Sequence, residues 1–290
     1  MLCPRYCGAD RDKGEKGYCG MGALPVIARA AAHFGEEPCL SGTKGSGAVF
    51  FSGCNMKCVF CQNRDISFEG HGLEVTVDRL AEILLELQDK GVHNINLVTG
   101  THFTDKICKA LKIAKLDIPV VWNSGGYDSI ESLKMLEGLI DIYMPDFKYT
   151  SPKYAKLYSG AEDYRDVAIK AIKEMYRQVG GVQFDDNEML TKGIIIRHLV
   201  LPQRLDDCFD VIDWVQDTFP EGDVIFSLMS QYTPLNDLSS YPEITRPITL
   251  EEQMRAQSYF ELSNIELGYT QELAASGNEL IPDFDGTGVL

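Results

Sequence analysis

The sequence predicts an α/β protein built on a parallel β-sheet. From Gly47 onward, short apolar runs typical of buried strands alternate with longer segments whose apolar residues recur at helical spacing. Six strand–helix units follow one another in this way, and such an alternation predicts parallel strands joined by crossover helices. We therefore expect a partial (β/α)6 barrel of the TIM type, preceded by a Cys-rich N-terminal extension.

Each expected element rests on a local pattern. The strands are apolar runs at residues 48–52, 94–98, 118–122, 140–144, 193–201 and 224–229. The helices carry one apolar face, and they begin at or near Thr76, Thr104, Ser129, Asp163, Asp206 and Thr249. Active groups of barrels of this type lie at the carboxyl ends of the strands, so we look for function there.

The periodic part of the chain has clear limits. Residues 46–265 form the expected barrel. Residues 1–45 show little periodicity beyond an apolar run around 24–32, so we expect an irregular extension. Residues 266–290 are expected to form a C-terminal tail, with coil from 278 to 288.

Composition narrows the function classes. The 290 residues are 44% hydrophobic, which suffices for the core of one large domain, and no apolar run approaches the ~18 residues of a membrane span. Cys3, Arg5, Cys7 and Asp10 stand where a signal peptide would need an apolar segment, so we expect a soluble cytoplasmic protein with no membrane partner. Nine cysteines without an export signal favour reduced thiols and metal binding. The net charge of −16, with no basic cluster, argues against nucleic acid as a partner.

Three cysteines directly after the first expected strand are the strongest functional signal. Cys54, Cys58 and Cys61 form a C-x3-C-x2-C pattern. Their three thiolates can bind three irons of one [4Fe-4S] cluster and leave the fourth iron open to a ligand. Structural zinc is the alternative, but it needs a fourth ligand, and the nearest candidate after Cys61 is His71.

This loop, with the aromatic Phe60 before the last cysteine, resembles the radical S-adenosylmethionine (SAM) superfamily. The resemblance implies that the open iron binds the amino and carboxylate groups of SAM. It further implies that one electron from the cluster, supplied by a flavodoxin- or ferredoxin-type reductant, cleaves SAM to methionine and a 5'-deoxyadenosyl radical, which takes a hydrogen atom from a substrate. Phe60 is then expected to pack near the adenine.

Polar residues at the ends of the second and third expected strands are candidate SAM contacts. Thr99, Thr101 and His102 stand where many members of the resembled superfamily carry a Gly-Gly-Glu motif that holds the SAM amino group. Asn123 and Ser124 suit a ribose or carboxylate contact. The alternatives are a helix N-cap with a chance histidine in the first case and a plain turn in the second.

The fourth and fifth strands supply the candidate catalytic residues. Asp146 and Lys148 lie on the same face of their strand. That face points into the barrel if the mouth of the barrel lies at this end of the strand. The activating enzymes of glycyl-radical proteins carry a similar Asp-x-Lys, so the resemblance implies a monovalent cation at Asp146 beside SAM. His198 is expected to contact SAM or substrate at the mouth. The alternative for Asp146 and Lys148 is a salt bridge at the rim of the barrel that contributes little to stability. The alternative for His198 is a core histidine whose ring nitrogens are hydrogen-bonded within the protein.

A second group of thiols lies near the N-terminus. Cys3, Cys7 and Cys19 have a spacing that permits zinc or a second cluster, with Cys39 or His33 as a fourth ligand. Thiols without a metal are the alternative.

The resemblance extends nearly end to end. It rests on CPRYCG at 3–8, HFGEEP at 33–38, LSG at 40–42, FSGC at 51–54, NLVT at 96–99 and FDGTG at 284–288. Together these segments are similar to uncharacterised radical SAM relatives of pyruvate formate-lyase activating enzyme. The function expected first is hydrogen abstraction from a small molecule or peptide in a closed chamber. Activation of a glycyl-radical enzyme is the second hypothesis, and a non-catalytic iron–sulfur or zinc protein is the third.

Overall fold

The computed structural model describes residues 2–271 and 281–290, and these residues form an open barrel. Ten strands make one sheet in the order β10-β9-β8-β6-β5-β4-β2-β1-β3, with β7 paired to β8. Every neighbouring pair from β2 to β10 along this order is parallel. The sheet does not close, because β3 ends it on one side and β10 on the other. This confirms the predicted α/β class and partial barrel.

All six predicted strands are present. They are β2 (Ser46–Phe51), β4 (Ile95–Val98), β5 (Val120–Ser124), β6 (Ile142–Pro145), β8 (Leu190–Leu199) and β9 (Ile225–Met229). The remaining strands are β1 (Val26–His33), β3 (Leu73–Glu74), β7 (Gln183–Phe184) and β10 (Leu267–Thr270).

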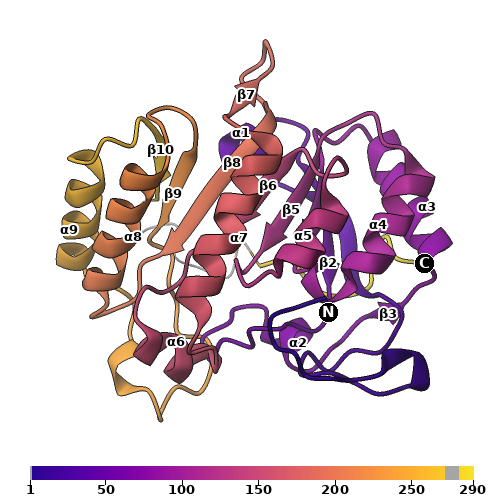
Figure 1. Ribbon diagram of the computed structural model, residues 1–290, viewed down its shortest axis with the longest axis horizontal. Coiled ribbons are helices and arrows are strands. Elements are labelled where there is room, and N and C mark those ends of the chain that lie inside the picture. Colours follow the sequence, from indigo (N-terminus) through magenta and orange to yellow (C-terminus); the bar gives the residue numbers. More distant parts are fainter. Residues whose placement is uncertain (1, 272–280) are drawn as a thin grey trace.

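Helices cover the outer face of the sheet (Figure 1). They are α3 (Val77–Asp89), α4 (Thr104–Ala114), α5 (Ile130–Leu136), α7 (Tyr164–Val179), α8 (Leu205–Thr218) and α9 (Leu250–Glu261). The remaining helices are α1 (Pro38–Ser41), α2 (Arg64–Ser67), α6 (Pro152–Ser159), and the 3-10 turns η1 (Arg11–Lys13), η2 (Thr101–Phe103) and η3 (Pro242–Ile244). None of the described helices is long and apolar enough to cross a membrane.

Side-chain caps start several of these helices as predicted. Thr76, Ser129 and Thr249 each accept a hydrogen bond from a backbone N–H in the first turn, and Thr249 does so within a capping box. The predicted start of a helix at Thr104 is confirmed, but the expectation that Thr104 caps that helix is wrong. It is the first helical residue of α4, and its hydroxyl donates to the carbonyl of Thr101 at 2.8 Å.

The N-terminal extension is not irregular throughout, which corrects the sequence prediction. Residues 26–33 form β1, which pairs antiparallel with β2 along most of its length. Its sequence VIARAAAH contains four alanines and only two β-branched residues, so strand propensity alone does not reveal it. The strand forms because its neighbour β2 is fully buried and would otherwise leave an open edge.

The C-terminal tail reaches both edges of the sheet. Its first part is strand β10, which pairs with β9. Residues 272–280, which include 278–280 of the expected coil, lie outside the described residues, and after them the chain packs on β1, next to the edge strand β3. There the N–H of Gly286 donates to the carbonyl of Ala28, and the N–H of Ala30 donates to that of Thr287, both at 2.9 Å.

Alternation along the strands divides the sheet into two faces. Outward side chains such as Trp122 and Tyr143 join the large core beneath the helices. Inward side chains form a smaller apolar layer with Leu40 of α1, including Val121 and Ile195. The segment of α1 therefore plugs the barrel at the amino ends of the strands, while the carboxyl ends remain available for a site.

Candidate functional site

The loop with the three cysteines leaves the carboxyl end of β2, as predicted. Neighbouring segments fix its backbone. The N–H of Gly53 donates to the carbonyl of Ile66 at 2.7 Å, and the N–H of Val59 donates to that of Tyr158 at 2.9 Å. Asn236 donates from its amide to the carbonyls of Val59 and Cys61, at 3.1 and 3.0 Å. The loop is thus held by three separate parts of the chain.

The thiols of this loop sit among hydrogen-bond donors. Ser159 donates to Sγ of Cys58 at 3.0 Å, and Ser67 donates to Sγ of Cys61 at 3.4 Å. The N–H of Met56 lies 3.3 Å from Sγ of Cys54. Donors of this kind favour thiolate ligands, and hydrogen bonds to the sulfurs tune iron–sulfur clusters.

Burial makes two of these thiols poor acids without a metal. Burial, followed by repulsion from Cys58 and Cys61, raises the pKa of Cys54 to about 12. Burial and then Cys58 raise the pKa of Cys61 as well. Thiols with raised pKa values need a cationic centre to become thiolates, and metal binding then releases their protons. The donor set therefore fits a cluster that takes one thiolate on each of three irons.

A single metal ion finds no comparable site. No group of three or more Cys, His, Asp or Glu side chains within residues 2–271 and 281–290 converges as the ligands of one ion would. Zinc at the loop, which would need a fourth convergent ligand, stays the alternative. A second metal at Cys3, Cys7 and Cys19 stays a prediction.

Arg5 of the N-terminal extension is bound to the cysteine loop. Its guanidinium donates to the carbonyls of Asn55 at 2.6 Å and Ser159 at 2.7 Å, and also to that of Gly160. It lies 4.2 Å from the ring centroid of Tyr18, a cation–π contact. The extension thereby ties the loop to the end of α6.

Replacing Arg5 by alanine should loosen the loop, because several carbonyls lose their donor. We expect the free energy of unfolding to fall by about 1–3 kcal/mol and the reconstituted cluster to be lost faster to a chelator. Denaturant unfolding and the rate of absorbance loss measure the two effects. Arg165, an exposed arginine on α7, provides the control, and equal behaviour of Arg5→Ala and Arg165→Ala would refute this role.

Asp146 lies between two cations beside the cysteine loop. Its Oδ2 is 2.6 Å from Nζ of Lys148, and its Oδ1 is 3.0 Å from Nε of Arg197. Burial alone would raise the pKa of Asp146, but Lys148 and Arg197 together hold it below its usual value. Each carboxylate oxygen therefore has one cationic partner, and the monovalent cation expected at Asp146 stays a prediction.

Arg197 connects this pair to the interior of the barrel. Its Nη2 donates to Oδ1 of Asn123 at 2.7 Å, and its Nη1 donates to Oε2 of Glu36 at 3.2 Å. Asn96 donates to Oε1 of Glu36 at 2.9 Å. We call Glu36, Glu37, Asn96, Asn123 and Arg197 the polar floor. It lies above the apolar plug of α1 and below the cysteine loop.

Glu36 should make stability depend on pH. Burial raises its pKa to about 7, with Glu37 and Asp146 adding to the rise and Arg197 opposing it. The unfolded carboxyl, with its ordinary pKa, loses its proton first. The folded state therefore binds more protons between about pH 4.5 and 7, and stability falls as pH rises through that window.

The variant Glu36→Gln should lack this contribution. Denaturant unfolding at pH 5 and pH 7.5 should show a smaller loss of stability in the variant than in the wild type. The same slope in both proteins would show that Glu36 keeps an ordinary pKa.

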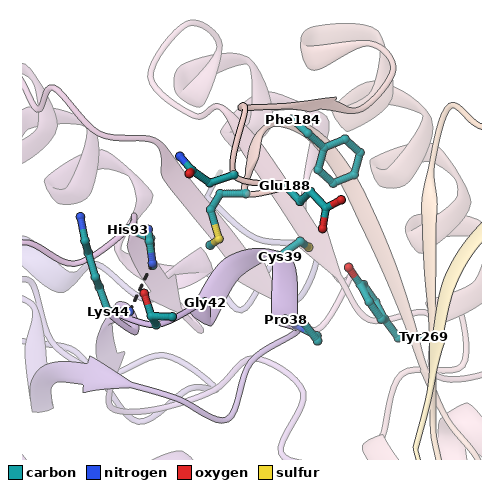
Figure 2. A pocket seen from close by; sticks show the side chains of 11 residues that line it. Pro38, Cys39, Gly42, Lys44, His93, Phe184, Glu188 and Tyr269 are labelled. Atoms are coloured by element: carbon teal, nitrogen blue, oxygen red, sulfur yellow. Dashed lines mark hydrogen bonds between the residues drawn. The ribbon is translucent and has the colours of Figure 1, made fainter.

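One cavity lies at the opposite end of the strands. It has a volume of about 880 Å³ and is lined by residues that include Cys39, Lys44, His93, Glu188 and Tyr269 (Figure 2). His93 precedes β4 and Glu188 precedes β8, so the cavity opens at their amino ends, beneath α1. This cavity is therefore separate from the cysteine loop. We place the candidate functional site at the loop, because the loop carries the three thiols.

Comparison with known proteins supplies the family. The radical SAM superfamily profile matches residues 48–184. The uncharacterized protein MJ0674 of Methanocaldococcus jannaschii is 32% identical over 280 residues, which are 92% of this chain and 76% of that protein. The chain belongs to the radical SAM superfamily. Membership implies a [4Fe-4S] cluster and SAM as cofactors. The narrower kinship with pyruvate formate-lyase activating enzyme stays a prediction.

Two solved structures are similar in shape. SuiB of Streptococcus suis, in a crystal structure bound to S-adenosylmethionine, is 15% identical over 82% of this chain, with a TM-score of 0.49. Methylornithine synthase (PylB) is 11% identical over 74% of this chain, with a TM-score of 0.50. This chain spans 49% and 60% of their respective lengths. At such low identity the second similarity supports the fold alone.

Two of the predicted SAM contacts in this radical SAM chain bond to a buried carboxylate. Thr101 donates to Oδ1 of Asp128 at 2.7 Å, and Ser124 donates to Oδ2 at 2.6 Å. Asp128 thereby joins the ends of β4 and β5. Thr99 has a φ of +61°, an unusual value for a β-branched residue, at the point where β4 ends. SAM contacts by these residues stay predictions.

The two predicted histidines are buried and bonded to backbone carbonyls. Nε2 of His102 lies 2.8 Å from the carbonyl of Ser52, at the start of the cysteine loop, and burial lowers its pKa to about 4. Nδ1 of His198 lies 2.7 Å from the carbonyl of Phe147. His198 is on the outer face of β8, whereas its neighbour Arg197 faces the barrel. The cofactor role of His102 and the catalytic role of His198 stay predictions.

Phe60 is buried in an aromatic group. It makes edge-to-face contacts with Tyr149, Tyr158 and Tyr232 at centroid distances of 6.5, 6.2 and 6.0 Å. These contacts fix the last turn of the cysteine loop. Packing of Phe60 near the adenine stays a prediction.

Proposed function

We propose that this chain is an enzyme that reductively cleaves SAM and uses the resulting radical to take a hydrogen atom from a small molecule or peptide in the barrel. The observation that carries this proposal is the position of the Asp146–Lys148–Arg197 group. It joins the cysteine loop to a polar barrel interior, where a substrate would meet a radical formed at the loop.

The chain's own residues would bind and orient the reactants. Cys54, Cys58 and Cys61 would hold the cluster, which when bound supplies the electron for SAM cleavage. Burial alone would lower the pKa of Lys148, but Asp146 and then Cys58 raise it, so its ammonium keeps its charge beside the loop. This ammonium is suited to the carboxylate of SAM.

Chain segments around the barrel favour a small substrate over a protein loop. Phe284 of the tail packs on Phe50, an inward residue of β2, with ring centroids 5.5 Å apart. Arg5 fastens the N-terminal extension to the cysteine loop on another side. Such covering segments exclude water from reactive intermediates. Activation of a glycyl-radical enzyme needs an opening wide enough for a protein loop, and it remains the second hypothesis.

Anaerobic reconstitution tests the proposal. The protein is loaded with iron and sulfide, reduced with dithionite, and incubated with SAM, and 5'-deoxyadenosine is measured by chromatography. We expect product, and we expect SAM to change the electron paramagnetic resonance spectrum of the reduced cluster. A fully loaded cluster whose spectrum does not respond to SAM would contradict the proposal and favour a non-catalytic iron–sulfur protein.

A further inference from the structure

Two acceptor atoms of the polar floor have no partner. Oε2 of Glu37 and Oδ1 of Asn96 are buried and make no hydrogen bond within the described part of the chain. Glu37 is 8% exposed and Asn96 is fully buried. Buried polar atoms nearly always have a partner, and an unpaired one destabilises the fold by about 1–3 kcal/mol. Two such atoms on members of the polar floor indicate a place for a ligand in the barrel interior between the polar floor and the cysteine loop, which we call the chamber.

Both residues belong to the chamber. Asn96 stands on the inward face of β4, where its Nδ2 bonds to Glu36. Glu37 follows Glu36 in the chain and lies near Arg197: burial alone would lower the pKa of Arg197, but Asp146, Glu37 and Glu36 raise it. Asn96 is three residues before Thr99 at the strand end, a depth of about 10 Å at ~3.3 Å per residue.

The ion pairs of the chamber leave one carboxylate without a direct partner. Its carboxylates are Glu36, Glu37 and Asp146, and its cations are Arg197 and Lys148. Asp146 takes both cations as direct partners, and Glu36 shares Arg197. Glu37 is left without a direct ion pair among the described residues. One positive charge with several N–H donors would satisfy Glu37 and Asn96 together.

We propose that the polar floor binds a primary ammonium group, so that the substrate of this enzyme is an amine. An anion would be repelled by the carboxylate of Glu37 and would offer neither acceptor a proton, and a neutral hydroxyl offers one proton for two acceptors. The ammonium sits at the floor, and the hydrogen atom is taken from a carbon nearer the strand ends. The identity of the substrate rests on the function proposed above, but the binding of the ammonium does not.

Calorimetric titration of the cluster-loaded protein with n-pentylamine, in the presence of SAM, tests the site. 1-Pentanol is the neutral probe of the same length. We expect pentylamine to bind and pentanol to bind at least ten-fold more weakly. Glu37→Gln should weaken pentylamine binding about ten- to hundred-fold, the range for a hydrogen bond to a charged group.

Glu188→Gln is the matched control, because Glu188 lines the cavity at the other end of the barrel (Figure 2). It should leave the affinity unchanged. Loss of binding in Glu188→Gln with retention in Glu37→Gln would place the amine in that cavity and overturn the proposal. Equal affinity for amine and alcohol, or no binding of the amine by the wild type, would overturn it too.

A second variant covers the case in which Glu37→Gln does not fold. Asn96→Ala removes the other free acceptor and should weaken pentylamine binding several-fold, while unchanged affinity would overturn the proposal. A capped tripeptide with a central lysine distinguishes the two possible sources of the ammonium group. Binding of the tripeptide indicates that the substrate is a peptide amine, and failure to bind indicates that it is a small free amine. SAM cleavage without amine binding would refute only this inference, and amine binding without SAM cleavage would refute only the proposed function.

Discussion

Replacing Cys58 by alanine should reduce cluster content and SAM cleavage to background. Two thiolates cannot hold three irons, and Cys58 is the most buried of the three cysteines of the loop, at 6% exposed. The change also leaves the hydroxyl of Ser159 without its sulfur acceptor. Iron and sulfide analysis, the absorption spectrum and 5'-deoxyadenosine formation measure the loss.

Cys208 offers a matched control for this substitution. It is a fully buried thiol on α8, outside the cysteine loop, so Cys208→Ala removes the same atoms from a core position. We expect that variant to load a full cluster and cleave SAM, with a modest loss of stability from the cavity. A full cluster spectrum in Cys58→Ala would show that Cys58 is not a ligand.

Local patterns predicted the parallel strands and most helix starts because each signal lies within one element. Apolar runs revealed β2, β4, β5, β6, β8 and β9, and capping residues at Thr76, Ser129 and Thr249 marked helix starts. Strand β10 escaped detection because LGYT is short and half exposed. Strand β1 escaped because its stability comes from pairing with β2, which the alanine-rich sequence does not encode locally.

The polar floor could not be predicted, because its members meet only through the fold. Glu36 and Glu37 enter the barrel because β1 runs antiparallel to β2 and delivers the following segment to the amino ends of the strands. Arg197 and His198 are adjacent in sequence but face opposite sides of β8. Their register against β6 and β9 decides which of the two enters the chamber. The sequence carried one sign of the polar floor, which was the unusual Arg197 within an otherwise apolar strand.

The largest electrostatic effect is expected for Asp146→Ala. The change leaves the side chains of Lys148 and Arg197, 18% and 14% exposed, without their shared carboxylate. Breaking a buried ion pair in this way costs about 3–5 kcal/mol, because Lys148 stays buried without a carboxylate and Arg197 keeps only Glu36. The exposed pair Lys156–Glu162, at 2.8 Å, is the control: Glu162→Ala should cost less than about 1 kcal/mol.

Measuring stability and activity together distinguishes a purely structural role of Asp146 from a role in orienting the reactants. If the carboxylate only holds the fold together, the double variant Asp146→Ala, Arg197→Met should recover part of the lost stability, since it removes a buried cation that has lost one of its two carboxylates, and SAM cleavage should recover with it. If the group also orients reactants at the cysteine loop, stability should recover while SAM cleavage stays low, although the cluster remains loaded. Denaturant unfolding and 5'-deoxyadenosine formation measure the two quantities on the same samples. Wild-type values of both in Asp146→Ala would remove this residue from the site. The contact of Asp146 with Lys148 and Arg197 would then no longer connect the cysteine loop functionally to the polar floor.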